Sequence, residues 1–369
     1  MLDPLVFVVQ SPTVCEILMR SRSVLLGPYP PPYGGVSVYI STLFDFIKND
    51  GVELWTYGDE KIAAPGVFFV AHRAFLPLLL LRRGRRARIA DSTHFLLEYP
   101  SLMAPVWVAL KAVLGFEWIK VIHDGSLPAR FQRFSKLRRA LFHLSIGRVS
   151  KFVVVTDELQ RWLREELSVS QEVLVIGSLL PGKKENPEVH PAMSAELSSY
   201  LNFPKRVCSI GAFIPDYGFD QVAEAVEQVR RTTGEKVGLV LLDGDFAADE
   251  DYRRRVLDGR EWIIVLKNVP HQDVPQILGS SDVFVRAFEF ESYGLSRVEA
   301  IWSGTPVIAT NAGETRGMLT YDFGNREELT NHLTAVLFGP TADDASDWAE
   351  RYRAEAENNL NKLRKLLTD

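Results

Sequence analysis

The stretch from Phe284 to Thr310 decides the fold, and its centre reads Glu291-Ser-Tyr-Gly-Leu-Ser-Arg-Val-Glu299. An apolar run, Val283 to Arg286, leads into this segment, and the run Thr305-Pro306-Val307-Ile308-Ala309 follows it. Both runs are short and rich in β-branched residues, as buried strands are, and the segment between them predicts a short helix. Two carboxylates, Glu291 and Glu299, therefore flank the start of a helix that follows a strand.

The N-terminus of such a helix is suited to bind phosphate. Its first backbone N–H groups have no partner inside the helix, the helix dipole favours negative charge, and Gly294 allows close approach to the backbone. The carboxylates can accept hydrogen bonds from sugar hydroxyls. Phosphate and hydroxyl groups together indicate a nucleotide sugar. An alternative reading of the spacing is a capping box, in which Glu299 closes its own helix with Ser296.

The rest of the chain repeats the alternation of strand and helix. Further apolar runs occur at Val24 to Gly27, Ile119 to His123, Phe152 to Thr156, Val173 to Ile176, Arg206 to Gly211, Val237 to Leu242 and Ile263 to Leu266. Continuous apolar strands that alternate with helices predict an α/β fold with parallel sheets covered on both faces. Ligands of such sheets bind at the loops that follow the strands.

The length of the chain and a break in its apolar pattern predict two domains. A chain of 369 residues exceeds the usual size of one hydrophobic core. A charged segment rich in Pro and Gly begins at Pro181 and interrupts the apolar pattern. We therefore expect Rossmann-like domains at residues 1–182 and 183–345. Residues 346–369 should form a helix that packs back toward the first domain, because this segment is rich in good helix formers.

The motif as a whole resembles retaining glycosyltransferases of the two-Rossmann GT-B fold, in particular family 4, whose signature is Glu, seven residues and Glu before a Gly-Thr-Pro-Val strand. The N-terminal half agrees, because Pro28 to Ser37 resembles the family's first glycine-containing loop and Val121 to Gly125 its histidine loop. The resemblance covers roughly Val24 to Leu337. It implies transfer of a sugar from a nucleotide sugar to an acceptor hydroxyl with retention of configuration, in a lipid-linked, glycan or small-molecule acceptor.

The resemblance also implies roles for individual residues. Glu291 would contact the transferred sugar beside His123, and these two are the candidate catalytic residues. The candidate donor-binding residues are Gly34, Gly35, Tyr293, Gly294, Leu295 and Glu299, the last of which would hold the ribose hydroxyls. His94 and Asp124 are secondary candidates on the acceptor side. No metal and no cofactor beyond the nucleotide-sugar co-substrate are expected, and Asp243-Gly244-Asp245 is not expected to bind a metal.

The second domain departs from the family at its first loop. Family members carry an Arg and a Lys there that neutralise the donor diphosphate, whereas Ala212 and Tyr217 occupy those positions. Arg286 and Lys267, at the ends of two other strands, are the candidate replacements. An unusual donor, a catalytically degraded subunit that binds a sugar nucleotide or a partner, and a nucleotide-sugar epimerase are the alternatives.

Charge is concentrated in one part of the chain. Residues 73–151 contain 15 Lys and Arg and 4 Asp and Glu, a net +11, whereas the whole chain carries −5. Interleaved aromatic and leucine residues suit this window to an anionic membrane surface, although a solvated face is the simpler alternative. The acidic remainder argues against nucleic acid.

Compartment is indicated by the cysteines and by the start of the sequence. Only Cys15 and Cys208 are present, which excludes a disulfide framework, and Met1-Leu2-Asp3-Pro4 is not the basic start that we expect of a signal peptide. We expect a cytoplasmic protein, peripheral at the inner face of the membrane if the basic window binds lipid.

Overall fold

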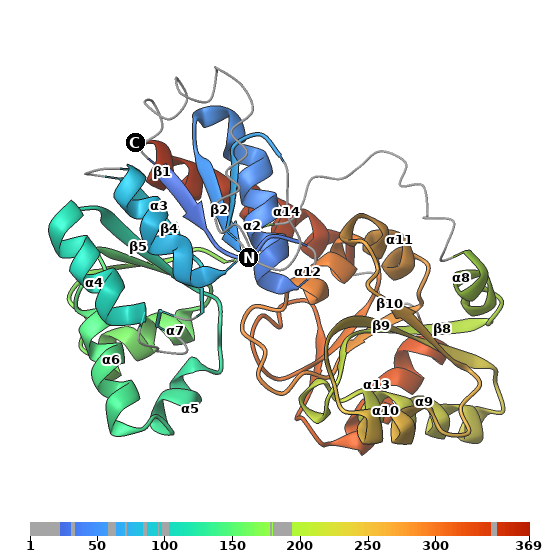
Figure 1. Cartoon of the computed structure of the whole chain (residues 1–369). Coiled ribbons are helices and arrows are strands. Elements are labelled where there is room, and N and C mark those ends of the chain that lie inside the picture. Colours follow the sequence, from blue (N-terminus) through green and yellow to red (C-terminus); the bar gives the residue numbers. More distant parts are fainter. Residues whose placement is uncertain are drawn as a thin grey trace, which may run out of the picture.

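The computed structural model describes residues 23–30, 34–57, 64–70, 72–83, 87–94, 96–97, 103–177, 179, 194–340 and 345–369. They form two α/β units, each built on one parallel sheet, so the predicted fold class is confirmed. Figure 1 shows the two units side by side, with the last helix, in dark red, lying between them. The expected boundary at residues 182 and 183 lies outside the described residues.

The first sheet has seven parallel strands in the order β3-β2-β1-β4-β5-β6-β7. Its strands are β1 (Ser23–Leu26), β2 (Glu53–Tyr57), β3 (Val67–Val70), β4 (Arg88–Asp91), β5 (Glu117–Ile122), β6 (Lys151–Val154) and β7 (Glu172–Val175). Its helices are α2 (Gly35–Ile47), α3 (Leu76–Arg83), α4 (Met103–Leu114), α5 (Leu127–Gln132), α6 (Lys136–Ile146) and α7 (Asp157–Arg161), with the shorter η1 (Lys48–Asp50), η2 (Arg73–Phe75) and η3 (Trp162–Glu166). Val24 and Leu26 pack in one core cluster and Leu25 in another, so β1 is buried on both faces.

The second sheet has six parallel strands in the order β10-β9-β8-β11-β12-β13. Its strands are β8 (Lys205–Phe213), β9 (Val237–Ala248), β10 (Ile263–Lys267), β11 (Val283–Arg286), β12 (Val307–Thr310) and β13 (Leu319–Tyr321). Its helices are α8 (Ser194–Leu201), α9 (Phe219–Thr233), α10 (Glu250–Leu257), α11 (Val274–Gly279), α12 (Leu295–Trp302) and α13 (Arg326–Phe338), with the short η5 (Pro215–Tyr217) and η6 (His271–Asp273). Val207 and Cys208 point into different core clusters, which shows the same burial on both faces.

Every strand that the apolar runs predict is present, within one to a few residues at each end. The pattern does not predict β2, β3, β4 and β13. In β2 and β4 the apolar run is interrupted by charged residues that find partners in the structure: Trp55 Nε1 donates to Glu53 at 3.1 Å, and Arg88 Nε donates to Glu117 at 2.8 Å. Strand β9 also runs beyond its predicted end, because Ala248 pairs with Phe213 after an irregularity in the ladder.

Helix α14 (Ala345–Thr368) connects the two units. Its first half packs Tyr352 and Ala356 into the core of the second unit, and its second half packs Leu363 and Leu367 into the core of the first. In Figure 1 this helix passes from the second unit to the first and ends near β1. Within the described part of the chain, no helix has both the length and the apolar content that a bilayer crossing requires.

Candidate active site

The strand orders locate the site before any side chain is considered. In each sheet the order reverses beside the first strand, so β1 lies between β2 and β4, and β8 lies between β9 and β11. Ligands of open parallel sheets bind outside the carboxyl ends of the strands at such a reversal. The loops that follow β1, β4, β8 and β11 are therefore the ones that can form a ligand site, and they contain most of the predicted residues.

The loop between β11 and α12 owes its shape to Gly294. This residue has φ +85°, which disfavours other residues, and a Cβ there would lie 2.8 Å from Cδ of Arg297. Gly294 is the N-cap residue of α12, and no side chain in the described part of the chain caps this helix. Ser296 thus lies inside the helix, so the capping-box alternative for Glu299 is wrong. The first backbone hydrogen bond of the helix is donated by Arg297 N–H to the carbonyl of Gly294, so the amides of Leu295 and Ser296 precede it.

Glu291 is held between two arginines. Arg286 Nε, at the end of β11, donates to Oε2 of Glu291 at 2.7 Å, and Arg297 Nε lies 4.0 Å from the same oxygen. Burial would raise the pKa of Glu291, but the two guanidinium groups outweigh burial and lower it. Glu291 is therefore an ionised carboxylate, able to accept but not to donate hydrogen bonds.

The two positions that depart from the family pattern lie next to this pair. Ala212 is buried in β8, and the ring of Tyr217 lies against Gly211, where a Cβ would approach it to 2.5 Å. Tyr217 stacks on Phe288 with ring centroids 4.4 Å apart, and the Arg286 guanidinium lies 5.0 Å from each centroid. An arginine beside an aromatic pair thus occupies the loop region in which the family places its cations.

Lys267 is not brought to this cluster. It ends β10 at the edge of the sheet and is exposed, and β9 and β8 separate it from β11. Three strand spacings amount to about 14 Å between the backbones of β10 and β11. Of the two predicted replacement cations, only Arg286 therefore lies beside Glu291.

Glu299 has a partner that the sequence analysis misses. It is buried on α12, and Nε2 of His271 donates to its Oε1 at 2.6 Å. His271 follows β10 in η6, so the rule that sites gather at strand ends could have drawn attention to it. Burial would lower the pKa of His271, but the Glu299 carboxylate outweighs burial and raises it above 6.5.

This pair makes the stability of the chain depend on pH. A histidine whose folded pKa is raised stabilises the fold fully below its unfolded pKa of 6.5, and this contribution disappears as pH rises through the folded pKa. We expect the unfolding free energy to fall with pH above 6.5, by about 1.4 kcal/mol for each unit of raised pKa, and expect His271→Gln to remove that part of the slope. Urea unfolding of both proteins from pH 6 to pH 9 measures it. Parallel curves would show that His271 does not contribute.

On the opposite side, Gly34 and Gly35 begin α2 in open space. Among the residues that the structure describes, none would lie within 4 Å of a Cβ at either glycine. Gly34 is extended, with φ −154°, which any residue can adopt. The start of α2 therefore has room at both glycines, as far as the described residues extend.

His123 lies in the loop after β5. Its Nε2 is 3.1 Å from Oγ of Ser92, and its ring meets Tyr39 edge-on with centroids 4.5 Å apart. Burial first, then the nearby His94 and Lys120, lower the pKa of His123 well below 6.5. The imidazole is therefore neutral at pH 7, and His94 lies close enough to influence it.

Asp124 has a local structural role. Its Oδ1 accepts hydrogen bonds from the backbone N–H of Ser126 at 2.8 Å and from the hydroxyl of the same residue at 2.6 Å. Its other oxygen pairs with Arg130. These contacts lower the pKa of Asp124 against the opposing effect of burial. The carboxylate is thus occupied by the start of α5.

Two close approaches bring the halves of the site together. A Cβ at Gly125, in the histidine loop, would lie 2.8 Å from Cα of Ser292, and a Cβ at Gly177, after β7, would lie 2.6 Å from the ring of Tyr293. Tyr293 accordingly packs against the cores of both units. The histidine loop therefore touches the loop that carries Glu291.

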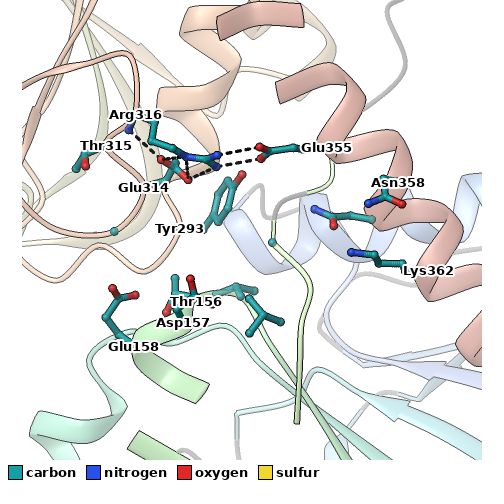
Figure 2. Close-up of a pocket in the computed structure, with 15 residues that line it drawn as sticks. Thr156, Asp157, Glu158, Tyr293, Glu314, Thr315, Arg316, Glu355, Asn358 and Lys362 are labelled. Carbon is teal, nitrogen blue, oxygen red and sulfur yellow. Dashed lines mark hydrogen bonds and ion pairs between the residues drawn. The ribbon is translucent and has the colours of Figure 1, made fainter. Parts of the chain in front are cut away.

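A polar cavity of about 350 Å³ lies behind this contact. Figure 2 shows Tyr293 near Thr156, the N-cap residue of α7, with the side chains of Asn358 and Lys362 on α14 across the cavity. Gly313, which also lines the cavity, has φ +69°, and a Cβ there would lie 2.5 Å from the carbonyl oxygen of Ser292. The cavity is thus bounded by both units and by the helix that joins them.

The arrangement of two parallel-sheet units is the GT-B fold, and three comparisons show which proteins the chain resembles. Residues 201–366, which include most of the second unit and of α14, match the family model of Glycosyl transferases group 1. The chain is 23% identical to the alpha-monoglucosyldiacylglycerol synthase of Streptococcus pneumoniae, over 89% of this chain and 81% of the relative. It is also 23% identical to the 2-deoxystreptamine glucosyltransferase of Streptomyces kanamyceticus, over 62% of this chain and 63% of the relative.

A solved structure shows the same fold over nearly the whole chain. Anabaena Alr3699/HepE, in a complex with UDP-glucose, superposes with a TM-score of 0.67 at 17% identity. The match covers 93% of this chain and 99% of that one. The chain is therefore similar in sequence to curated glycosyltransferases and in fold to a protein that binds a nucleotide sugar.

Proposed function

We propose that the protein transfers a sugar from a nucleoside diphosphate sugar to an acceptor hydroxyl with retention of anomeric configuration. The observation that carries this proposal is the ionised Glu291, held beside Arg286 at the start of α12 and opposite the neutral His123 loop. Carboxylates accept hydrogen bonds from sugar hydroxyls, and the N-terminus of a helix beside an arginine can bind phosphate.

The proposed reaction needs no metal or further cofactor. The bond between the anomeric carbon and the phosphate oxygen breaks, the acceptor oxygen bonds to that carbon on the same face, and the departing phosphate takes the acceptor proton. Charge on the leaving phosphate is stabilised by Arg286 and by the amides of Tyr293 to Leu295. Glu291 holds the transferred sugar, and Glu299 holds the ribose with His271 behind it. Neutral His123 can hydrogen-bond the sugar without adding charge.

UDP-glucose is the first donor to test. The names of both curated relatives refer to glucosyl products or glucosyl transfer, and the structural neighbour binds UDP-glucose. A thermal-shift screen of UDP-, GDP-, ADP- and CMP-sugars identifies the donor, because a ligand that binds the folded state raises the midpoint of unfolding. Acceptor-dependent release of nucleoside diphosphate then supports transfer. A rearranged sugar would indicate an epimerase, and binding without turnover would indicate a degraded, sugar-nucleotide-binding subunit.

The acceptor side of the proposal includes an anionic membrane surface. Helix α4 packs against α3 and α6, and these helices, with η2, expose apolar side chains: Phe75, Leu78, Leu81, Val106, Val113, Leu137 and Leu144. Lys136, Arg138 and Arg139 add positive charge on α6. Exposed apolar groups among cations suit the interface of an anionic bilayer. Such a surface would bring a lipid-linked acceptor to the first unit, and would make the protein peripheral at the inner face of the membrane.

Binding to vesicles tests this surface. We expect cosedimentation with vesicles that contain phosphatidylglycerol, little with pure phosphatidylcholine, and about a tenfold loss of binding for Leu137→Asp, which places a charge in the apolar interface. Leu201→Asp is the matched control, because Leu201 is also exposed but lies in the second unit. Equal binding to both vesicle types would refute the membrane role and leave the transferase proposal intact.

A further inference from the structure

Arg297 is a buried cation inside α12, between the two motif carboxylates. Its side chain is fully buried, with 0% exposure. Nη1 donates to the carbonyl oxygens of Ala312 and Glu314, and Nη2 donates to Oγ1 of Thr310 at 2.8 Å. The residue therefore fixes the loop after β12, which forms one wall of the candidate site.

The Nε donor of Arg297 lies on the side of Glu291. Its Nε lies 4.0 Å from Oε2 of Glu291 and has no hydrogen-bond partner among the described residues. Burial lowers the pKa of Arg297 to about 10, with Glu291 opposing the change, so the guanidinium is still charged at pH 7. A buried charge is costly unless a neighbouring charge offsets it, and the Glu291 carboxylate, 4.0 Å from Nε, provides that opposite charge.

The charge balance of the site explains why a second arginine is present. The resemblance implies two cations in the first loop, and these two together with Glu291 alone, leaving Glu299 aside, would carry a net charge of +1. Here Ala212 and Tyr217 remove both cations, and Arg286 alone would be neutralised by Glu291 at 2.7 Å. Counting Arg297 restores the net charge to +1. The two cations of this chain, Arg286 and Arg297, thus come from β11 and α12 and not from the first loop of the second unit.

We infer that Arg297 is a positioning residue of the donor site, which offsets the charge of Glu291 from the core side and so leaves Arg286 able to bind a diphosphate. This inference rests on the proposed function, because it assumes a diphosphate donor. Arg297 itself touches no ligand: it acts through Glu291. Its effect should therefore appear in the affinity for the second phosphate and should depend on the charge of Glu291.

A double-mutant cycle tests the inference. Affinities for UDP, UMP and uridine are measured by calorimetry for wild type, Arg297→Met, Glu291→Gln and the double variant, or for the corresponding series of another base if the screen selects it. We expect Arg297→Met to reduce the ratio of UDP to UMP affinity about tenfold, and to change it less than about twofold in the Glu291→Gln background. Arg260→Met is the control, since Arg260 pairs with Glu227 just before β10, at the edge of the sheet away from β11 and α12. In this control variant the ratio of UDP to UMP affinity should not change.

The possible outcomes separate the inference from the proposed function. If Arg297→Met weakens UDP, UMP and uridine equally, or changes the ratio by the same factor in both backgrounds, Arg297 has only a structural role and the inference is overturned. If wild type binds no nucleotide, the proposed function fails and the inference with it. Should Arg297→Met not fold, Arg297→Gln takes its place in the cycle, because its amide can still donate toward the carbonyl of Ala312.

Discussion

Replacing Arg286 by alanine is expected to weaken the binding of nucleoside diphosphate by about 10-fold to 100-fold, the range for loss of charge-assisted hydrogen bonds to phosphate. Arg286 is the one predicted replacement cation that lies beside Glu291, and its loss also leaves that carboxylate facing the phosphate site. Affinity for the free nucleoside should change little, because the ribose contacts assigned to Glu299 lie elsewhere on α12. Calorimetric titration with UDP and uridine measures both effects.

Two further variants make this result interpretable. Arg286→Lys keeps the charge but loses the fork geometry, so we expect an intermediate loss. Arg260→Ala removes an arginine paired with Glu227 just before β10, at the edge of the sheet opposite the site, and should leave UDP affinity unchanged. If Arg286→Ala binds UDP as tightly as wild type, the diphosphate is held elsewhere and the assigned role of Arg286 is wrong.

Much of the fold could be predicted from the sequence because buried parallel strands appear there as continuous apolar runs. The strands that escaped detection show where this signal ends. Glu53, Arg88 and Asp91 place charges in or at the ends of short strands, and only the folded neighbours, such as Glu117 for Arg88, make those charges tolerable. Tertiary pairing of this kind leaves no local pattern in the sequence.

The candidate site also combines features that the local sequence predicts with features that depend on tertiary contacts. Glu291, Arg286 and the His123 loop could be predicted because each follows a strand, and strand ends gather at one edge of a sheet. The pairing of His271 with Glu299 and the placement of Arg297 behind Glu291 could not, because they depend on which face of α12 meets which loop. The capping-box alternative failed for a related reason: the left-handed backbone at Gly294 begins the helix before Ser296, so the spacing alone was ambiguous.

Replacing Gly125 by alanine is expected to reduce the turnover of transfer by about 10-fold to 100-fold while nucleotide affinity changes less than about threefold. The new Cβ would lie 2.8 Å from Cα of Ser292, and ordinary contact begins at 3.4 Å, so the two loops must separate by at least 0.6 Å. Displacements near 1 Å between reacting groups can reduce rates about 100-fold. The nucleotide site is proposed within the second unit and should be preserved.

Gly147→Ala is the matched control for this variant. Gly147 lies in the same unit at the end of α6, and a Cβ there would lie 3.5 Å from the carbonyl oxygen of His143, an ordinary contact. Steady-state kinetics with the donor that the screen identifies should therefore show a loss for Gly125→Ala alone. Full turnover in Gly125→Ala would mean that the contact between the histidine loop and the Glu291 loop is not part of the reacting state. A drop in nucleotide affinity as large as the drop in turnover would instead place Gly125 in donor binding, because separation of the two loops alone should leave nucleotide affinity nearly unchanged.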